Sequence, residues 1–226
     1  AYTSAKKHAR DVYPLESCGL IVNGEYLPCE NKAADVSMHI DDRNCSCQKC
    51  SFRIDGSVIA KYHGRIQVIV HSHPDGPIYP SKLDAEQQQK SGISWAIIPL
   101  DADRIGDPVV WGGDTEIAPI IGRRFVHFAS DCYTLIRDCY RLGHDELLKQ
   151  GITEWPFDPV TLPDFPRDNS WWDGSDDLYS SEYSNLGFKV IQRSEARPGD
   201  GFLMSIRSEK LNHGGLLVGN GLILHH

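Results

Sequence analysis

The stretch RIQVIVHSHP at residues 65–74 constrains the fold more than any other part of the chain. Its apolar run is continuous rather than alternating, which is typical of a strand that is buried within a sheet. The proline that ends the run stops the strand from continuing. We therefore expect a mixed α/β unit around this strand, and the pattern of apolar residues places the end of that unit near residue 115.

Further elements are predicted on both sides of this strand. Asn23-Gly24 separates two short apolar runs, which is the strongest short-range signal of a β-hairpin. A helix that stops at Pro14 precedes the hairpin. The elements expected here are a helix over residues 3–13, strands over 18–22 and 25–29, an irregular polar stretch over 35–56, a helix over 81–92 and a strand over 94–100.

A second unit is predicted to begin near residue 120. SDCYTLIRDCYRLG has a helical stripe of apolar and small residues that Gly143 closes, and NHGGLLVGNGLILHH reads as two strands around Gly219-Asn220-Gly221. PGDGFLMSI is expected to form another strand, whereas residues 151–185 have no regular pattern. The fold class is therefore α/β (α+β) with two domains, which we expect over residues 1–117 and 118–226.

Composition excludes several classes of protein. Lys and Arg number 23 against 31 Asp and Glu, which gives a net charge of −8, and no basic cluster suited to nucleic acid is present. No apolar run reaches the roughly 18 residues that a membrane-spanning helix needs, and no secretory leader is visible. Seven cysteines in such a chain favour a reducing compartment over a disulfide framework.

HSHPDGPIYPSKLD, residues 71–84, has the residue types of a metal site. Residues two apart in a strand share a face, so His71 and His73 project together. Asp84 can return to the same place, and two imidazoles with one carboxylate are a ligand set of catalytic zinc. The alternative is that Ser81 and Asp84 form only a capping box and that the histidines are simply solvated.

The same residues, with Glu16 upstream in ESCG, resemble the motif of the JAMM (MPN-type) metallopeptidases over roughly residues 1–115. The resemblance implies that His71, His73 and Asp84 bind zinc. It also implies that Glu16 is the general acid/base for the hydrolytic water and that Ser81 stabilises the oxyanion.

CSCQKC at residues 45–50 is not explained by that resemblance. Cys45, Cys47 and Cys50 lie close enough in sequence to share a soft metal or an iron–sulfur cluster, with Cys18 or Cys29 as a fourth ligand. The alternative is that they are reduced surface thiols.

Cys132 is predicted at the first turn of its helix, where the helix dipole and free amides lower the pKa of a thiol. On an apolar stripe a cysteine is more often a small buried hydrophobe, which is our interpretation of Cys139. For Cys132 the partners would be His213, at the start of a strand, and His225, across the hairpin, in a papain-type arrangement. The side chain of His226 should point to the face of the strand opposite to that of His225.

SDCYTLIRDCY together with NHGGLLVGNGLILHH is similar to the NlpC-type cell-wall peptidases over about residues 120–226. The resemblance implies that Cys132 is the nucleophile, His213 the base and His225 the residue that orients it. Later strands of such a domain are expected to lie beyond His226, so the second domain is incomplete in this interpretation.

The order of the two halves, with LPDFPRDNSWW and the terminal LHH, resembles tail assembly proteins of lambda-like bacteriophages. This resemblance implies two peptidases that act on peptides of bacterial peptidoglycan, with other tail-tip proteins as partners. Synthesis in the host cytoplasm would be followed by action from the virion tail in the host cell wall or periplasm. A non-catalytic tail-tip scaffold is the alternative, and an isopeptidase of the deubiquitinase kind is a weaker one.

Overall fold

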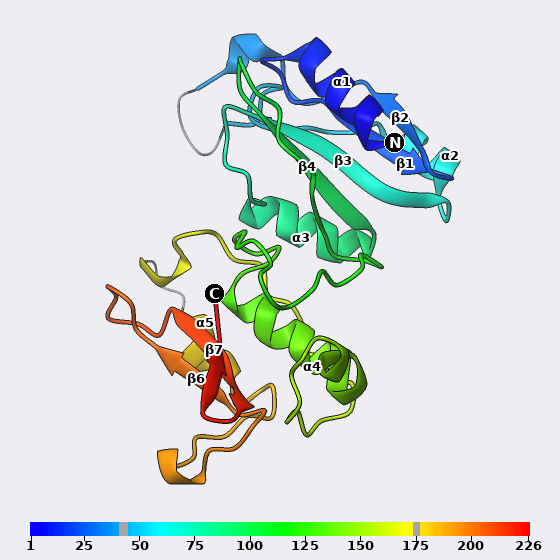
Figure 1. Cartoon of the computed structure of the whole chain (residues 1–226). Helices are drawn as coiled ribbons and strands as arrows, with labels where there is room; N and C mark the ends of the chain where they lie inside the picture. The colour runs from blue at the N-terminus through cyan, green and yellow to red at the C-terminus, as the bar shows by residue number, and fades with distance from the viewer. Residues whose placement is uncertain (41–44, 174–176) are drawn as a thin grey trace. The chain divides into compact units, whose positions relative to one another are not determined.

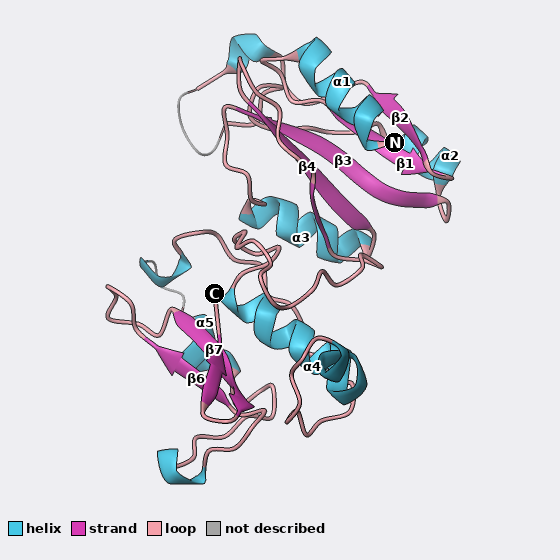
Figure 2. Ribbon diagram, in the orientation of Figure 1, coloured by secondary structure: helices cyan, strands magenta, loops and turns pink. Residues whose placement is uncertain are grey.

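The computed structural model describes residues 1–40, 45–173 and 177–226, which form two compact units, residues 1–115 and 116–226 (Figure 1). Each unit contains its own sheet and its own hydrophobic core, and the mixed α/β class is as predicted (Figure 2). Among the described residues, no helix combines the length and the apolar character needed to cross a membrane.

The first unit is built on a five-stranded sheet with the order β2-β1-β3-β4-β5. Its strands are β1 (Cys18–Val22), β2 (Glu25–Cys29), β3 (Ile66–Pro74), β4 (Ser94–Leu100) and β5 (Val109–Trp111). β3 and β4 are parallel neighbours joined through a helix, and the other neighbouring strands are antiparallel. The hairpin about Asn23-Gly24 is confirmed, with both residues at positive φ.

The helices of this unit are α1 (Tyr2–Val12), α2 (Gly56–Tyr62) and α3 (Lys82–Ser91), with a short 3-10 helix η1 (Val36–Met38). The two predicted helices, α1 and α3, are confirmed. α2 was not predicted, although Asp55 caps its first turn by accepting a hydrogen bond from the Ser57 amide. An Asp cap is a weak signal when the helix that follows has only seven residues, too few to show a helical period.

α1 packs on one face of the sheet, and this arrangement decides where the β3 histidines point. Ala5 and Ala9 of α1 share a core with Val70 of β3. Because side chains alternate along a strand, His71 and His73 project from the opposite face. There His71 meets the edge of Trp95 from β4, with ring centroids 5.7 Å apart.

The second unit pairs a long helix, α4 (Cys132–Lys149), with a three-stranded antiparallel sheet in the order β6-β7-β8. The strands are β6 (Gly201–Met204), β7 (His213–Gly219) and β8 (Leu222–Leu224), as predicted. Gly143 closes the first helical segment as expected, since its φ of 69° is non-helical, and a second helical segment follows across the kink. Pro159 lies so close to Gly143 that a Cβ there would meet the proline nitrogen at 2.7 Å.

The segment after α4 is irregular but well packed. It contains the short helices η2 (Trp171–Asp173), α5 (Leu178–Glu182) and η3 (Arg193–Glu195), and residues 174–176 lie outside the described part. Trp155 is 1% exposed and Trp171 is 6% exposed. These two side chains therefore face the protein interior.

Candidate functional site

The predicted ligands of the first unit converge in the structure. His71 Nε2 lies 3.0 Å from His73 Nε2 and 3.4 Å from Asp84 Oδ1, and His73 Nε2 lies 3.6 Å from Asp84 Oδ2. All three side chains are buried. The parallel β3–α3–β4 connection produces this convergence, because it returns the chain to the end of β3 at the start of α3.

Ser81 and Asp84 form the predicted capping box at the start of α3. The Ser81 Oγ accepts from the Asp84 amide at 3.1 Å, and the Ser81 amide donates to Asp84 Oδ2 at 2.8 Å. The Ser81 hydroxyl also donates to Asp84 Oδ2 at 2.6 Å. The cap and the cluster are therefore not alternatives, since the cap fixes the carboxylate that faces the histidines.

The surroundings of the histidines define their donor atoms. His73 Nδ1 lies 2.8 Å from the Pro77 carbonyl, so this nitrogen carries the proton and Nε2 keeps its lone pair toward the cluster. Phe52 stacks on the His71 ring at 4.5 Å between centroids. His71 Nδ1 has no hydrogen-bond partner in the described ranges, so hydrogen bonding of that ring is confined to Nε2, and Phe52 packs on its face.

Burial and charge set the ionisation of these groups. Burial lowers the pKa of His71, which favours the neutral imidazole that metals bind. Burial opposes the charged form of Asp84, but the charges and hydrogen bonds of His71 and His73 outweigh it and hold the pKa of Asp84 well below its usual range. Burial likewise opposes the charged form of His73, yet the hydrogen bond to Asp84 and the charge of Glu16 raise its pKa.

Glu16 lies in the two-residue approach to β1, beside this cluster. Its neighbour Ser17 is tied to β3, because the Ser17 amide donates to Ser72 Oγ at 2.8 Å and the Ser72 amide donates to the Ser17 carbonyl at 3.0 Å. Burial raises the pKa of Glu16 to about 8, with His73 lowering it and Asp84 raising it. A carboxyl whose pKa lies near neutrality can take and return a proton at working pH.

The donor set fits a divalent metal ion. One ligand atom from each of His71, His73 and Asp84 lies within 4.8 Å of the others, and these two nitrogens and one oxygen leave room for a further ligand. Two histidine Nε2 atoms facing each other beside a carboxylate is an arrangement that a shared cation satisfies. The chain therefore carries a group of side chains that could hold a metal ion at the place that the sequence predicted.

A second cluster forms at the cysteine-rich stretch. Cys45, Cys47 and Cys50 gather around His39, with all four ligand atoms within 4.8 Å of one another. The predicted fourth ligand is therefore wrong, because Cys18 and Cys29 lie on β1 and β2 and do not belong to this group. His39 was missed because no spacing motif links it to the cysteines across residues 41–44, which lie outside the described residues.

In the second unit Cys132 is the first residue of α4, as predicted, but its pKa is not lowered. Its Sγ lies 3.1 Å from the Tyr179 hydroxyl of α5. Burial and the charge of Asp131 raise the pKa of Cys132 above its ordinary value, against hydrogen bonds from Tyr179 and the Gly214 amide. The helix start therefore does not produce a thiolate by itself, because the thiol is withdrawn from water beside a carboxylate.

A buried ion pair fixes the start of α4. Asp131 caps the helix by accepting from the Thr134 amide at 3.0 Å. Its carboxylate also receives Arg167 through Nε at 3.0 Å and Nη2 at 2.7 Å, and both side chains are 4% exposed. Arg167 stacks over the Phe128 ring. No sequence pattern indicates this pair, because Arg167 lies 36 residues beyond Asp131 in a segment without periodicity.

The histidines of the second unit meet on neighbouring strands. His213 Nε2 lies 3.2 Å from His225 Nδ1, and the rings pack edge to face. His226 instead lies beside Arg123 and Phe125, so the predicted difference between His225 and His226 is observed. His213 precedes Gly214, whose amide reaches the Cys132 sulfur. The hydrogen bond made by the Cys132 side chain goes to Tyr179, which the sequence did not reveal.

Comparisons with known proteins agree with both halves. The family described as prokaryotic homologs of the JAB domain matches residues 1–111, and the NlpC/P60 family matches residues 106–226. A solution structure of a protein from Salinibacter ruber is 18% identical, with a TM-score of 0.30, and covers 49% of this chain and 76% of its own.

Two curated relatives span most of the chain. Tail tip assembly protein K of Escherichia phage lambda is 31% identical over 74% of this chain and 72% of its own length. The protein of the same name from Escherichia phage N15 is 28% identical over 97% of this chain and 81% of its own length. The chain therefore belongs to the tail tip assembly protein K family and combines a JAB-type domain with an NlpC/P60 domain, both of peptidase families.

Proposed function

We propose that the chain is a phage tail-tip peptidase with a metal-dependent centre in the first unit and a cysteine-dependent centre in the second. The observation that carries this proposal is the convergence of His71, His73 and Asp84 beside a buried Glu16 whose pKa is raised to about 8. Peptide bonds of bacterial peptidoglycan are the proposed substrate.

In the first centre, His71, His73 and Asp84 would hold a zinc ion. When bound, such an ion polarises a carbonyl and acidifies water. Glu16 would take the proton of the attacking water and return it to the leaving amine, for which its raised pKa suits it. The Ser81 hydroxyl, at the mouth of the cluster, would donate to the oxyanion by exchanging its bond to Asp84.

In the second centre, Cys132 would attack the carbonyl carbon while His213 accepts the thiol proton. His225 would orient His213 by its contact with Nε2, which leaves Nδ1 of His213 for the thiol. Because burial raises the pKa of Cys132, the proton would leave as the substrate binds rather than beforehand. The start of α4 and the Gly214 amide would support the developing charge.

Peptidoglycan as the substrate is supported by the coexistence of two peptidase-family domains in one tail-tip chain. A net charge of −8 does not attract the chain to an anionic wall, so recognition would rest on shape and hydrogen bonds. Other tail-tip proteins are the proposed protein partners. Action in the cell wall or periplasm during infection, after synthesis in the host cytoplasm, is the proposed location.

The test is hydrolysis of purified muropeptides with zinc present, followed by mass spectrometry of the products. We expect a chelator to remove one set of products and a thiol blocker another. Glu16→Gln should lose the first set while keeping the metal, and Cys132→Ala should lose only the second. If neither set appears with the wild-type chain, the enzymatic proposal fails.

A scaffold role is the second candidate, and the contact between Cys132 and Tyr179 favours it for the second unit. A nucleophile whose hydrogen bond goes to a tyrosine, with a raised pKa, is the state expected of a thiol that does not react. Tail assembly by phage that carry Cys132→Ala and His73→Ala separates the two. If tails assemble only with the wild-type residues although no muropeptide is cut, the scaffold role takes the place of catalysis.

A further inference from the structure

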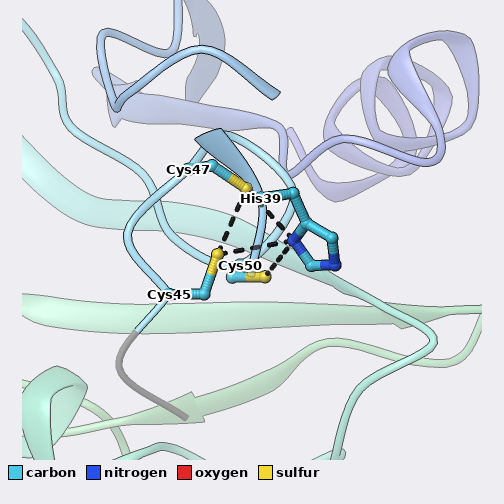
Figure 3. Close-up of side chains that lie close together, drawn as sticks. All are labelled: His39, Cys45, Cys47 and Cys50. Atoms are coloured by element: carbon cyan, nitrogen blue, oxygen red, sulfur yellow. Dashed lines mark hydrogen bonds between the residues drawn. The ribbon is translucent and has the colours of Figure 1, made fainter. Parts of the chain in front are cut away.

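A cluster of three cysteines and one histidine in the first unit lies outside the site described above. His39 Nδ1 is 3.4 Å from Cys45 Sγ and 3.5 Å from the sulfurs of both Cys47 and Cys50 (Figure 3). The Cys45 and Cys47 sulfurs are 3.4 Å apart. Figure 3 shows the three sulfurs and the imidazole nitrogen directed toward one another.

The sulfur–nitrogen separations are those of a tetrahedral zinc shell, and the Cys45–Cys47 sulfur separation of 3.4 Å is shorter than in such a shell. Metal bonds of ~2.3 Å to sulfur and ~2.0 Å to nitrogen imply ~3.8 Å between sulfurs and ~3.5 Å between sulfur and nitrogen. The observed sulfur–nitrogen distances, 3.4–3.5 Å, agree closely. An iron–sulfur cluster would need its ligands farther apart, because several iron and sulfide atoms lie between them.

A disulfide does not explain the group. All the cysteines are free, and the 3.4 Å between Cys45 and Cys47 sulfurs exceeds the ~2.0 Å of a covalent bond. Three thiols would leave one without a partner, and a disulfide gives no reason for His39 to lie in the centre. A single cation accounts for all four side chains at once.

Backbone hydrogen bonds hold the two segments that carry the four side chains. η1 ends at His39, whose amide donates to the Val36 carbonyl at 3.0 Å. Cys47 begins a tight turn, in which the Cys50 amide donates to its carbonyl at 2.9 Å. An isolated bridge pairs Cys47 with Ala34 and joins the turn to the η1 segment.

The same stretch lacks a hydrophobic core. Among the described residues between 31 and 55, Cys47 alone is buried, while Val36, Met38 and Ile40 are 45–68% exposed. Burial therefore cannot offset the conformational entropy of ordering such a segment. Small segments of this kind are stabilised by a structural metal, whose binding free energy becomes folding free energy.

We propose that His39, Cys45, Cys47 and Cys50 bind a structural zinc ion that anchors this segment beside Glu16. The Glu16 amide donates at 2.8 Å to the carbonyl of Gln48, which lies in the turn between Cys47 and Cys50. Asn31 donates to the Glu16 carbonyl at 3.1 Å, and the Gln48 side chain donates to the Asn31 carbonyl at 2.8 Å. That the zinc ion positions Glu16 as a general base rests on the proposed function. The zinc site itself does not depend on that function.

Metal content and cobalt spectroscopy of the whole chain test the site. We expect two zinc ions per wild-type chain, and one in Cys50→Ser or His39→Ala, whose side chains are exposed. Cobalt(II) should give a thiolate-to-metal charge-transfer band in the wild type and in His73→Ala, because the His71/His73/Asp84 cluster holds no sulfur. The matched control is Cys29→Ser, which should keep both ions and the band.

The outcomes separate the two metal sites. Full zinc and an unchanged band in both Cys50→Ser and His39→Ala would overturn this proposal and leave the first site intact. Loss of zinc in Cys50→Ser with none lost in His73→Ala would support this proposal and count against the proposed function. A wild-type chain without a charge-transfer band overturns the thiolate site directly.

Amide hydrogen exchange tests whether the proposed zinc site holds the Glu16 segment in place, and it does not require an activity assay. In Cys50→Ser the Glu16 and Gln48 amides should exchange at least tenfold faster than in Cys29→Ser, while amides of β3 and β4 are unchanged. Equal protection in the two variants would show that the metal does not hold the Glu16 segment.

Discussion

At the scale of single residues, the Cys132 thiol differs from an activated papain-type thiolate. We expect iodoacetamide to label Cys132 faster than Cys139, because Cys139 is fully buried and its pKa is raised to about 12. The labelling rate of Cys132 should keep rising with pH beyond the ordinary thiol pKa, since burial holds its own pKa above that value. Peptide mapping after brief labelling across a pH series measures both rates. A rate that is flat from acid to neutral pH would instead show a preformed thiolate.

The buried pair of Asp131 and Arg167 makes the free energy of unfolding depend on pH in the acidic range. Burial opposes the charged carboxylate, but Arg167 and the Thr134 amide lower the pKa of Asp131 below its usual value. The folded state therefore binds its proton more weakly than the unfolded state. The stabilisation is present above the ordinary pKa of ~3.9 and is lost as pH falls below it.

Asp131→Asn should accordingly destabilise the fold at neutral pH by less than the roughly 3–5 kcal/mol of a buried charge left unpaired, because Arg167 loses its bidentate partner but keeps Asp164 at 3.1 Å. The difference from the wild type should shrink as pH falls below ~4, because the unfolded wild-type chain then takes up a proton at Asp131 that the folded state binds more weakly. Denaturant unfolding at several pH values measures this. Glu146→Gln is the control, since its pair with Lys149 is exposed to solvent and contributes little to stability. A pH-independent difference would contradict the linkage.

At the scale of elements, the cap of α3 is also part of the metal cluster. Ser81→Ala should cost about 1 kcal/mol of stability by removing the cap. It should also lower metal affinity roughly 10–100-fold, because the hydroxyl and the capped turn orient Asp84. Zinc titration and denaturant unfolding of the same samples measure the two effects. Ser81→Thr, which keeps the hydroxyl, should restore both the stability and the metal affinity. A Ser81→Thr chain with wild-type stability but weaker metal affinity would show that the cap does not determine the metal affinity.

Local signals predicted most elements but few of the contacts between distant segments. The hairpin about Asn23-Gly24, the capped α3 and the β3 histidines follow from turn chemistry, capping and the two-residue period of a strand. His39 could not be found this way, because its place beside the cysteines depends on how an irregular segment closes.

The contacts of the second unit depend even more on tertiary packing. Tyr179 and Arg167 reach Cys132 and Asp131 from a loop whose path no periodicity describes. The pKa of Cys132 was misjudged for a related reason, since burial and the charge of Asp131 are properties of the packed structure. Sequence patterns therefore predicted the positions of the chemical groups better than their surroundings.

At the scale of the whole molecule, the two units should unfold separately. Each has its own core, so calorimetry of the full chain should show two transitions. A chelator should lower only the transition of residues 1–115, because both metal-binding clusters lie in that unit. Leu20→Ala and Leu135→Ala, each expected to cost 2–5 kcal/mol or thereabouts in its own core, assign the transitions. One cooperative transition that responds to both substitutions would contradict this.

The two-residue period of β3 also limits how such a gene can change over generations. His71 and His73 share a face only because one residue separates them, so a single codon inserted there would send one imidazole to the α1 side of the sheet. Codons added after Pro77, whose carbonyl fixes the His73 ring, and before Pro80 would lengthen a loop and leave the strand and the α3 cap in place. Insertions between generations of recombining phages can therefore be tolerated in such a loop. Within the codons of β3, substitutions can be tolerated but insertions cannot.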